Sequence, residues 1–288
     1  SKMNLENISI EKINKDDLHT LINWALDEGW NPGKNDVDVF WNTDPDGFYG
    51  FYSDEKLIAG GAIISYNREF GFMGLFIVHK DYRNKGLGNK LWHFRRDLLI
   101  SRLHSNASIG MDGVLAMQPF YNKGGFNIAF RDERYEFNSQ NIPASSNVSL
   151  INQEDVTDII EYDQIHFGFQ RSNFLINWLQ MPESKAVKYS ENDKILGYAV
   201  IRKADKGYKI GPLFADNPAV AEELFKSSLS IAPDNLIYLD IPTTNQNAID
   251  LVEKYNGNYV FECARMYYGT PPKIDINNIY GITTFELG

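Results

Sequence analysis

A glycine-rich loop between an apolar strand and an amphipathic helix is the feature that most limits the fold of this chain. The loop spans residues 83–88 and reads R-N-K-G-L-G. It follows the apolar run 72–78 and leads into a helical pattern over 89–100. Glycines let the backbone come close to a ligand, and the free N–H groups and dipole of a helix N-terminus attract phosphate. The sequence therefore predicts a strand–loop–helix unit that binds an anion.

The spacing R-x-x-G-x-G differs from both the Rossmann and the Walker glycine patterns. It resembles the pyrophosphate loop of the GNAT superfamily of N-acetyltransferases, which hold the pyrophosphate of acetyl-CoA there. The run from Val78 to Arg83 also resembles the family's V-x-P-x-Y-R, with Lys80 in place of the proline. A surface turn with an exposed arginine is the alternative, and the strand and helix on either side favour the GNAT interpretation.

A second segment supports the same resemblance. Residues 119–126 read P-F-Y-N-K-G-G-F and are similar to the GNAT pattern L-Y-E-K-x-G-F. The resemblance implies that Tyr121 protonates the departing CoA thiolate. A phenol has a pKa of about 10 and stays protonated at neutral pH, so it can donate to that thiolate. An aromatic ring packed on the sheet is the alternative for Tyr121.

An internal repeat predicts two copies of one fold. Residues 53–60 parallel residues 191–197, and Gly60 and Gly197 are 137 positions apart (197 − 60). Gly74 and Gly211 keep the same offset (211 − 74). With 288 residues, two domains are also expected from length. We predict an α/β (α+β) fold with two tandem GNAT-like domains, each a mixed, mostly antiparallel sheet flanked by helices.

The polar segment 138–147 is the predicted linker, which gives a catalytic GNAT domain at 1–137 and a GNAT-like domain at 148–288. The pattern of the first domain predicts, in order, a strand at 8–13, a helix from Lys15 or Asp16, a hairpin at 48–52 and 57–64, a strand at 72–78 and a helix at 89–100.

The second copy has lost the features that bind CoA. Residues 215–221 read A-D-N-P-A-V-A where the glycine loop should be, and Pro218 removes an N–H group. Residues 245–251 keep the GNAT pattern N-x-x-A-x-x-L, but Val252 replaces the tyrosine that follows it. We therefore expect the first copy to be catalytic and the second to be a degenerate partner.

The resemblance also implies where the ligands lie. Acetyl-CoA, as co-substrate, is expected on the strand, the loop and the later motif, through Phe76, Ile77, Val78, Arg83, Asn84, Lys85, Gly86, Leu87, Gly88, Asn89 and Phe120. The acceptor is expected near Trp30 and Glu28, because GNAT acceptor loops follow the first helix. Asp112 and Glu28 are the candidates for the base that receives the proton of the amine. Core packing for Trp30 and solvated carboxylates for the two acids are the alternatives.

Composition and charge exclude several other classes. Apolar residues make up 43% of the chain and aromatic residues 14%, which argues against disorder. A net charge of −10 without a basic block argues against a nucleic-acid partner. Cys263 is the single cysteine, and with no signal peptide evident we expect a cytoplasmic protein. No run suits a membrane span, and the scattered histidines predict no metal site.

The sequence thus predicts transfer of an acetyl or other acyl group from acetyl-CoA to a primary amine of a small molecule or peptide. Two alternatives stay open at this point. One is an acyl-CoA sensor without turnover, and the other is a tandem-GNAT aminoacyl transferase that uses charged tRNA. The acceptor, the acyl length, the general base, the role of the second domain and the oligomeric state are not determined by the sequence.

Overall fold

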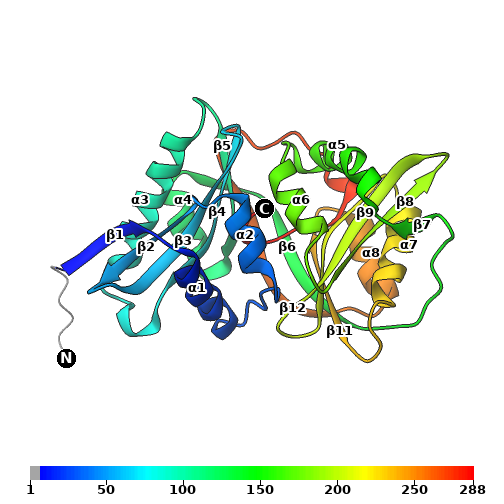
Figure 1. Cartoon of the computed structure of the whole chain (residues 1–288), viewed down its shortest axis with the longest axis horizontal. Helices are drawn as coiled ribbons and strands as arrows, with labels where there is room; N and C mark the ends of the chain where they lie inside the picture. Colours follow the sequence, from blue (N-terminus) through cyan, green and yellow to red (C-terminus); the bar gives the residue numbers. More distant parts are fainter. Residues whose placement is uncertain (1–6) are drawn as a thin grey trace.

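The computed structural model describes residues 7–288 and shows two similar halves side by side (Figure 1). The first half contains β1 (Ile8–Lys12), α1 (Lys15–Asp27), α2 (Asp36–Thr43), β2 (Phe48–Ser53), β3 (Lys56–Tyr66), β4 (Phe70–Val78), α3 (Leu87–Arg102), β5 (Ser108–Val114), α4 (Gln118–Lys123) and β6 (Phe126–Asn138). The second contains β7 (Val148–Leu150), α5 (Val156–Phe167), α6 (Ser172–Leu179), β8 (Ser184–Glu191), β9 (Lys194–Lys203), β10 (Tyr208–Ala215), α7 (Pro218–Leu229), β11 (Leu236–Pro242), α8 (Gln246–Lys254), β12 (Asn258–Tyr268) and β13 (Ile279–Gly281).

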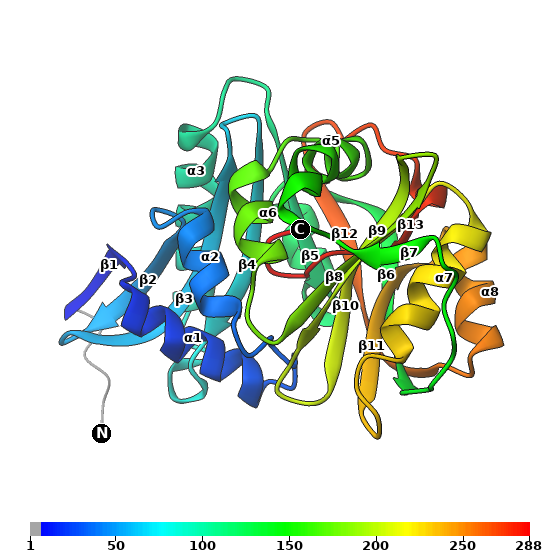
Figure 2. The ribbon, with the colours of Figure 1, turned by 45° about the vertical axis from the view of Figure 1, so that its right-hand side comes forward.

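The described strands form one 13-stranded sheet in the order β1-β2-β3-β4-β5-β12-β6-β11-β10-β9-β8-β7, with β13 paired to β10. The two central strands are exchanged between the halves. Strand β12 lies between β5 and β6, and β6 lies between β12 and β11. Each half therefore completes the sheet of the other, and β6 and β12 cross the middle of the molecule in Figures 1 and 2.

The exchanged strands pair over long stretches. Strand β12 runs antiparallel to β5 from Cys263 opposite Val114 to Tyr268 opposite Ile109. Strand β6 runs antiparallel to β11 from Asn138 opposite Leu236 to Asp132 opposite Pro242. These ladders join the two halves through backbone hydrogen bonds as well as side-chain packing.

Helices cover both faces of the sheet. Strand β3 shows the division, because Ala62 and Ile64 pack into one core and Ile63 into another, as the alternation of a strand requires. Helices α1, α2, α5 and α6 share the first core, which is continuous across both halves. On the opposite face α3 and α4 cover the first half, and α7 and α8 cover the second half in a separate core.

The predicted local structure of the first half is confirmed. The strand at 8–13, the helix from Lys15 and the hairpin are β1, α1 and β2–β3, and the strand and helix around the glycine loop are β4 and α3. Helix α1 begins where the Asn14 side chain accepts a hydrogen bond of 2.8 Å from the Asp17 N–H. The predicted α/β fold class with mostly antiparallel pairing is confirmed as well.

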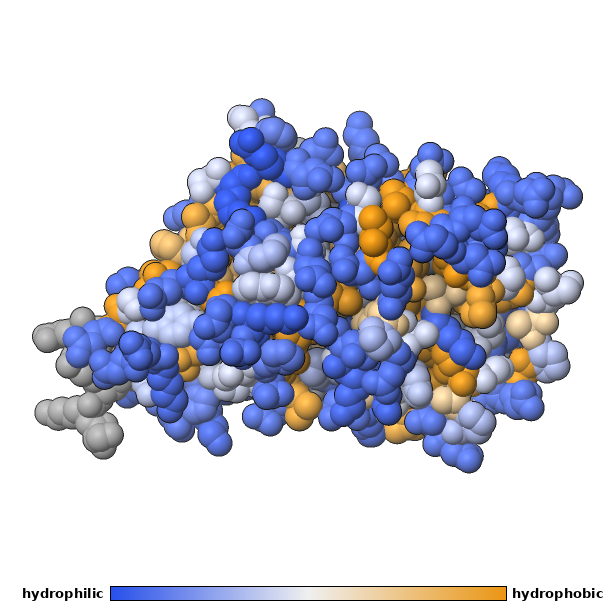
Figure 3. Space-filling view, viewed as in Figure 1, coloured by the Kyte–Doolittle hydropathy of each residue, from blue (hydrophilic) through white to orange (hydrophobic). Residues whose placement is uncertain are grey.

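The polar segment 139–147 contains neither helix nor strand and connects β6 to β7. The domain limits 1–137, 138–147 and 148–288 stay a prediction, since the sheet runs without a break through both halves. The face drawn in Figure 3 is mostly hydrophilic, with apolar side chains gathered over the second half. Among residues 7–288 there is no helix with the length and apolar character that crossing a bilayer requires.

Candidate functional site

A cleft opens in the first half because β4 and β5 diverge. The two strands are parallel and paired only from Phe70 opposite Ser108 to Met73 opposite Met111. Both continue beyond this point, to Val78 and Val114. The register of β4 against β3 also shifts here, and Leu75 has a φ of 52°, which is unusual for a residue other than glycine. The bulge bends β4 away from its neighbour and leaves a wedge-shaped gap.

Arg95 of α3 supports this bulge from behind. Its Nη2 donates hydrogen bonds to the carbonyl oxygens of Ala62, at 2.6 Å, and of Gly74, at 3.0 Å. The guanidinium is fully buried and forms no ion pair within residues 7–288. Burial lowers its pKa to about 9. Arg95 therefore brings a buried cation to the point where the strands separate.

The outer part of β4 presents free backbone groups to the gap. The His79 N–H donates to the Ile58 carbonyl at 2.9 Å. Alternate residues of an antiparallel ladder face the same neighbour, so Ile77 also faces β3, while Phe76 and Val78 face the gap. The Val78 carbonyl accepts a hydrogen bond of 2.9 Å from Arg83 Nε. The N–H of Phe76 is thus available to a ligand in the gap.

The glycine loop lies at the end of this gap and leads into α3. Asn84 and Gly86 have φ values of 63° and 77°, a conformation that suits glycine and asparagine. A Cβ on Gly86 would meet no atom within 4 Å, so the loop is open to a ligand. The first-turn N–H groups of Leu87, Gly88 and Asn89 have no carbonyl partner within the helix. The loop therefore has the orphan donors that a pyrophosphate needs.

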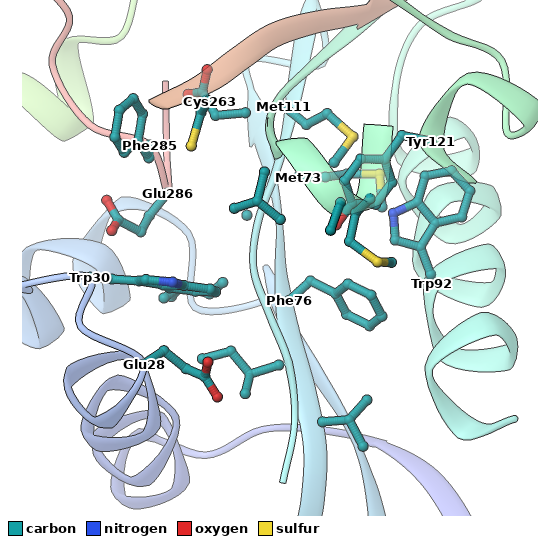
Figure 4. Close-up of a pocket in the computed structure, with 18 of the residues that line it drawn as sticks. Glu28, Trp30, Met73, Phe76, Trp92, Met111, Tyr121, Cys263, Phe285 and Glu286 are labelled. Atoms are coloured by element: carbon teal, nitrogen blue, oxygen red, sulfur yellow. The ribbon is translucent and has the colours of Figure 1, made fainter. Parts of the chain in front are cut away.

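A cavity of about 460 Å³ occupies the gap, and Figure 4 shows many of its lining side chains. Eight residues predicted for the site line it, which are Glu28, Trp30, Phe76, Ile77, Val78, Arg83, Asp112 and Tyr121. The other predicted loop residues, Asn84, Lys85, Gly86, Leu87, Gly88 and Asn89, lie beyond its end at the start of α3. Phe120 packs its ring against Trp92 and His93, with centroids 5.2 and 5.8 Å apart.

Tyr121 lies on α4, on the same side of the cavity as Trp92 (Figure 4). The two rings stack with centroids 5.7 Å apart. A Cβ on Gly113 would come within 2.9 Å of the Tyr121 ring, so glycine is what allows the ring to lie flat on β5. Burial raises the pKa of Tyr121 to about 12, against the opposing effect of Arg95. The hydroxyl is therefore a proton or hydrogen-bond donor, not a base.

Both carboxylates proposed near the acceptor are paired. Glu28 forms an ion pair with Arg83, which connects the end of α1 to the glycine loop. Asp112 forms a bidentate pair with Arg265 of β12, at 2.9 and 2.8 Å, and its side chain is completely buried. An ordinary solvated carboxylate, the alternative for both, does not describe Asp112. It lies instead in the interior of the joined sheet.

Part of the cavity wall could not be predicted. Phe261 and Cys263 of β12 line it, as do Phe285 and Glu286 near the end of the chain. Cys263, Phe285 and Glu286 lie opposite Tyr121 and Trp92 in Figure 4 and above Trp30. No local motif marks them, because only the strand exchange brings the second half to this cavity. Burial raises the pKa of Cys263, which argues against a thiolate there.

The equivalent place in the second half is closed. The Asn217 side chain accepts a hydrogen bond of 3.0 Å from the Val220 N–H, and Pro218 has no N–H to offer. Strands β10 and β11 also diverge after Ile210, but β13 fills their gap by pairing Gly281 with Leu213. The chain itself therefore fills the position that corresponds to the open gap of the first half.

No group of three His, Cys, Asp or Glu side chains within residues 7–288 is arranged to hold a metal ion. The expectation that the protein uses no metal stays a prediction.

Comparison with known families agrees with this division. The model described as "Acetyltransferase (GNAT) family" matches residues 15–126. The model described as "Acetyltransferase (GNAT) domain" matches residues 159–281. Holothin acyltransferase from Pseudoalteromonas sp. (strain SANK 73390) is 29% identical over 269 residues, which cover 92% of this chain and 89% of that protein.

Solved structures share the tandem arrangement. A putative acetyltransferase from Pyrococcus horikoshii superposes with a TM-score of 0.84 at 22% identity, covering 100% of this chain and 98% of that one. A tandem GNAT protein from the clavulanic acid biosynthesis pathway superposes with a TM-score of 0.63 at 12% identity, covering 92% and 99%. At these identities the likeness concerns the fold.

Proposed function

Because the chain belongs to the GNAT superfamily of acyl-CoA-dependent N-acetyltransferases and carries two GNAT domains in tandem, we propose that its first domain acylates a primary amine. The observation that carries this proposal is the meeting of three features in one cavity. These are the diverging strands β4 and β5, the free first-turn N–H groups of α3, and the buried hydroxyl of Tyr121.

Acetyl-CoA fits the free donors of this cavity. The N–H groups of residues 84–89 would hold its pyrophosphate, with Arg83 beside them. The pantetheine arm would pair with the backbone of Phe76 and Val78 as an added strand, while Ile77 faces β3 and Phe120 packs behind the site. The Val78 carbonyl must then exchange its Arg83 partner for the pantetheine amide, or share the two.

The chemistry follows from these positions. The bound amine first loses a proton to water, its neutral nitrogen forms a bond to the thioester carbon, and the Phe76 N–H stabilises the oxyanion of the tetrahedral intermediate. The carbon–sulfur bond then breaks as the carbonyl re-forms, and Tyr121 hydrogen-bonds the departing sulfur and passes its hydroxyl proton to it. The second proton that the nitrogen loses returns through water to the Tyr121 oxygen. Since the pKa of Tyr121 is raised to about 12, the hydroxyl is fully protonated beforehand and acts chiefly by hydrogen bonding to the developing thiolate.

The second half has a structural role in this proposal. Its own gap is filled by β13, and its loop is capped by Asn217. We extend this to the domain limits, with catalysis in 1–137 and a degenerate partner in 148–288. The relative named as a holothin acyltransferase favours a small-molecule acceptor over a peptide. We also propose that the transferred group is acetyl and not a longer acyl chain.

An assay of CoA release tests this function. Acetyl-CoA is incubated with the protein and a panel of primary amines, free thiol is measured, and products are identified by mass. We expect thiol release that depends on one class of amine and yields its N-acetyl derivative. An acyl-CoA sensor would bind acetyl-CoA in calorimetry but release no thiol with any amine. An aminoacyl transferase would use charged tRNA instead, and the acidic charge of the chain argues against that donor.

A further inference from the structure

The proposed reaction leaves the carboxylate of Glu286, in the wall of the cavity, without a role. Glu286 lines the cavity, and only 5% of the residue is exposed. Its Oε2 is buried and has no hydrogen-bond partner within residues 7–288. A buried carboxylate oxygen without a donor is costly, so a ligand that supplies a donor would be bound favourably there.

The backbone holds Glu286 in place beside the reaction centre. A Cβ on Gly74 would come within 2.0 Å of the Glu286 carbonyl oxygen, so this residue rests directly on the bulge of β4. The following residue is fixed on both sides. The Leu287 N–H donates to Thr284 Oγ1 at 2.8 Å, and its carbonyl accepts from the Tyr66 hydroxyl at 2.6 Å. The carboxylate therefore has a defined position and is not on a loose end.

Two basic residues interact electrostatically with Glu286, and of these Arg134 is engaged elsewhere and Lys209 is weakly basic. Arg134 forms a bidentate pair with Asp240, at 2.6 and 2.9 Å, and donates its Nη1 to the Trp30 carbonyl at 3.0 Å. Burial, with the nearby Arg134, lowers the pKa of Lys209 to about 7. No ion pair within 4.0 Å joins Glu286 to a cation among residues 7–288. The negative charge is therefore balanced only at a distance.

The walls around Glu286 are aromatic. Glu286 lies between Phe285 and Trp30 in Figure 4. Phe261 lines the same cavity. The rings of Phe261 and Phe285 meet edge to face with centroids 5.7 Å apart. A ligand with an aromatic or apolar skeleton fits between such walls. A single carboxylate beside them favours a cationic group on that ligand.

We propose that Glu286 binds the ammonium group of the acceptor and that Trp30, Phe261 and Phe285 hold its body, so that the acceptor is a small amine with an aromatic or apolar skeleton. This assignment rests on the proposed function, because it names the acceptor of that reaction. It also gives the second half a purpose, since the far end of the chain builds the site that receives the acceptor. The site of the amine is then adjacent to Gly74, where the thioester of acetyl-CoA would lie.

Equilibrium binding tests the charge selection without any acyl transfer. The full-length protein, with CoA present, is titrated in a calorimeter with three amines, which are benzylamine, 2-phenylethylamine and tryptamine. Each is compared with the alcohol of the same skeleton. We expect at least one amine to bind about tenfold or more tightly than its alcohol, because hydrogen bonds to a charged group are the strong ones. Equal binding of every amine and its alcohol to the wild type overturns the proposal.

Variants then locate the selection. Glu286→Gln keeps the shape and should remove the preference for amine over alcohol. Glu154→Gln makes the same change in charge on an exposed carboxylate and should keep the preference. Trp30→Leu should weaken the binding of the amine and of the alcohol by a similar factor. A preference that survives in folded Glu286→Gln overturns the proposal, and if that variant does not fold, the comparison in the wild type decides alone.

The outcome also separates this inference from the proposed function. Amine selection that depends on Glu286, without thiol release from acetyl-CoA, would leave the acceptor site standing and remove the transferase. Thiol release with amines that bind no better than their alcohols would do the reverse.

Discussion

Arg265 of β12 donates two hydrogen bonds, of 2.9 and 2.8 Å, to the carboxylate of Asp112 on β5, and this pair joins the two halves of the molecule next to the cavity. Both side chains are almost fully buried. The guanidinium also lies over the Phe72 ring, 5.0 Å from its centroid. The floor of the cavity thus depends on a residue from the distant half of the chain.

Replacing Arg265 by methionine should destabilise the protein by about 3–5 kcal/mol, because Asp112 would be left as a buried charge without a partner. Urea unfolding measures this loss. The double variant Asp112→Asn with Arg265→Met should recover part of this stability, since neither position then carries a buried charge. A single variant as stable as the wild type would contradict the role given to this pair.

Asp132 should make stability fall as pH rises. Burial first, and the neighbouring Asp112 second, raise the pKa of Asp132 well above its usual value. The folded state therefore binds a proton that the unfolded state has already lost above about pH 4, and stability decreases as pH climbs toward the folded pKa. Asp132→Asn removes this titration. Urea midpoints at pH 5 to 8 should show the variant gaining on the wild type as pH rises, and a constant difference would refute the shift.

Tyr121→Phe removes the proton donor and keeps the ring stacked on Trp92. We expect kcat to fall by about 10²–10⁴-fold, the range of general acid–base catalysis. Acetyl-CoA affinity by calorimetry should stay near that of the wild type. Gly113→Ala is an independent test, because its methyl group would push the Tyr121 ring and should also lower kcat. Full turnover in Tyr121→Phe, with chemistry rate-limiting, would reduce the residue to packing.

Gly86→Asp should weaken CoA binding by about tenfold or more, which is about 1.4 kcal/mol. The open space around Gly86 lets the fold survive, but its φ of 77° and the new carboxylate oppose a pyrophosphate. Gly269→Asp is the matched control, since Gly269 is exposed, has a φ of 82° and lies outside the loop. Calorimetry with CoA measures both, and equal affinities would place the pyrophosphate elsewhere.

Asn217→Ala should cost about 1 kcal/mol of stability, because Asn217 caps α7 through the Val220 N–H. CoA affinity should not change, since the gap beside this helix is filled by β13. Thermal unfolding and calorimetry report the two effects separately. A loss of CoA binding in this variant would assign the second half a ligand that the proposal denies it.

Much of this architecture could be predicted from local sequence patterns. The glycine loop, the apolar run of β4 and the repeat offset between Gly60 and Gly197 were enough to predict the family, the fold class and two tandem copies. These features rest on short-range patterns, in which periodicity and turn residues express the local structure directly. The predicted positions of Tyr121 and Trp30 at one cavity also follow from family order along the chain.

The exchange of strands and the far wall of the cavity could not be predicted in this way. The residue pattern of strand β12 does not indicate which strand it pairs with, so its pairing with β5 cannot be derived from it. The position of Glu286 depends on contacts with Gly74 and Tyr66, more than 200 residues earlier in the sequence. The buried pairing of Asp112 has the same origin. Such long-range contacts leave no periodic signal in a single sequence.

Because β6 and β12 are exchanged, neither half of the chain contains a complete sheet of its own. A gene split at 139–147 would yield one fragment whose β5 and β6 lack the strand between them, and another whose β11 and β12 lack theirs. Each would expose sheet edges prone to aggregation. The covalent connection keeps the partners at a high local concentration, so that each half is finished by its neighbour as the chain folds. We therefore expect each half to depend on the other for folding, even where the functions of the two halves differ.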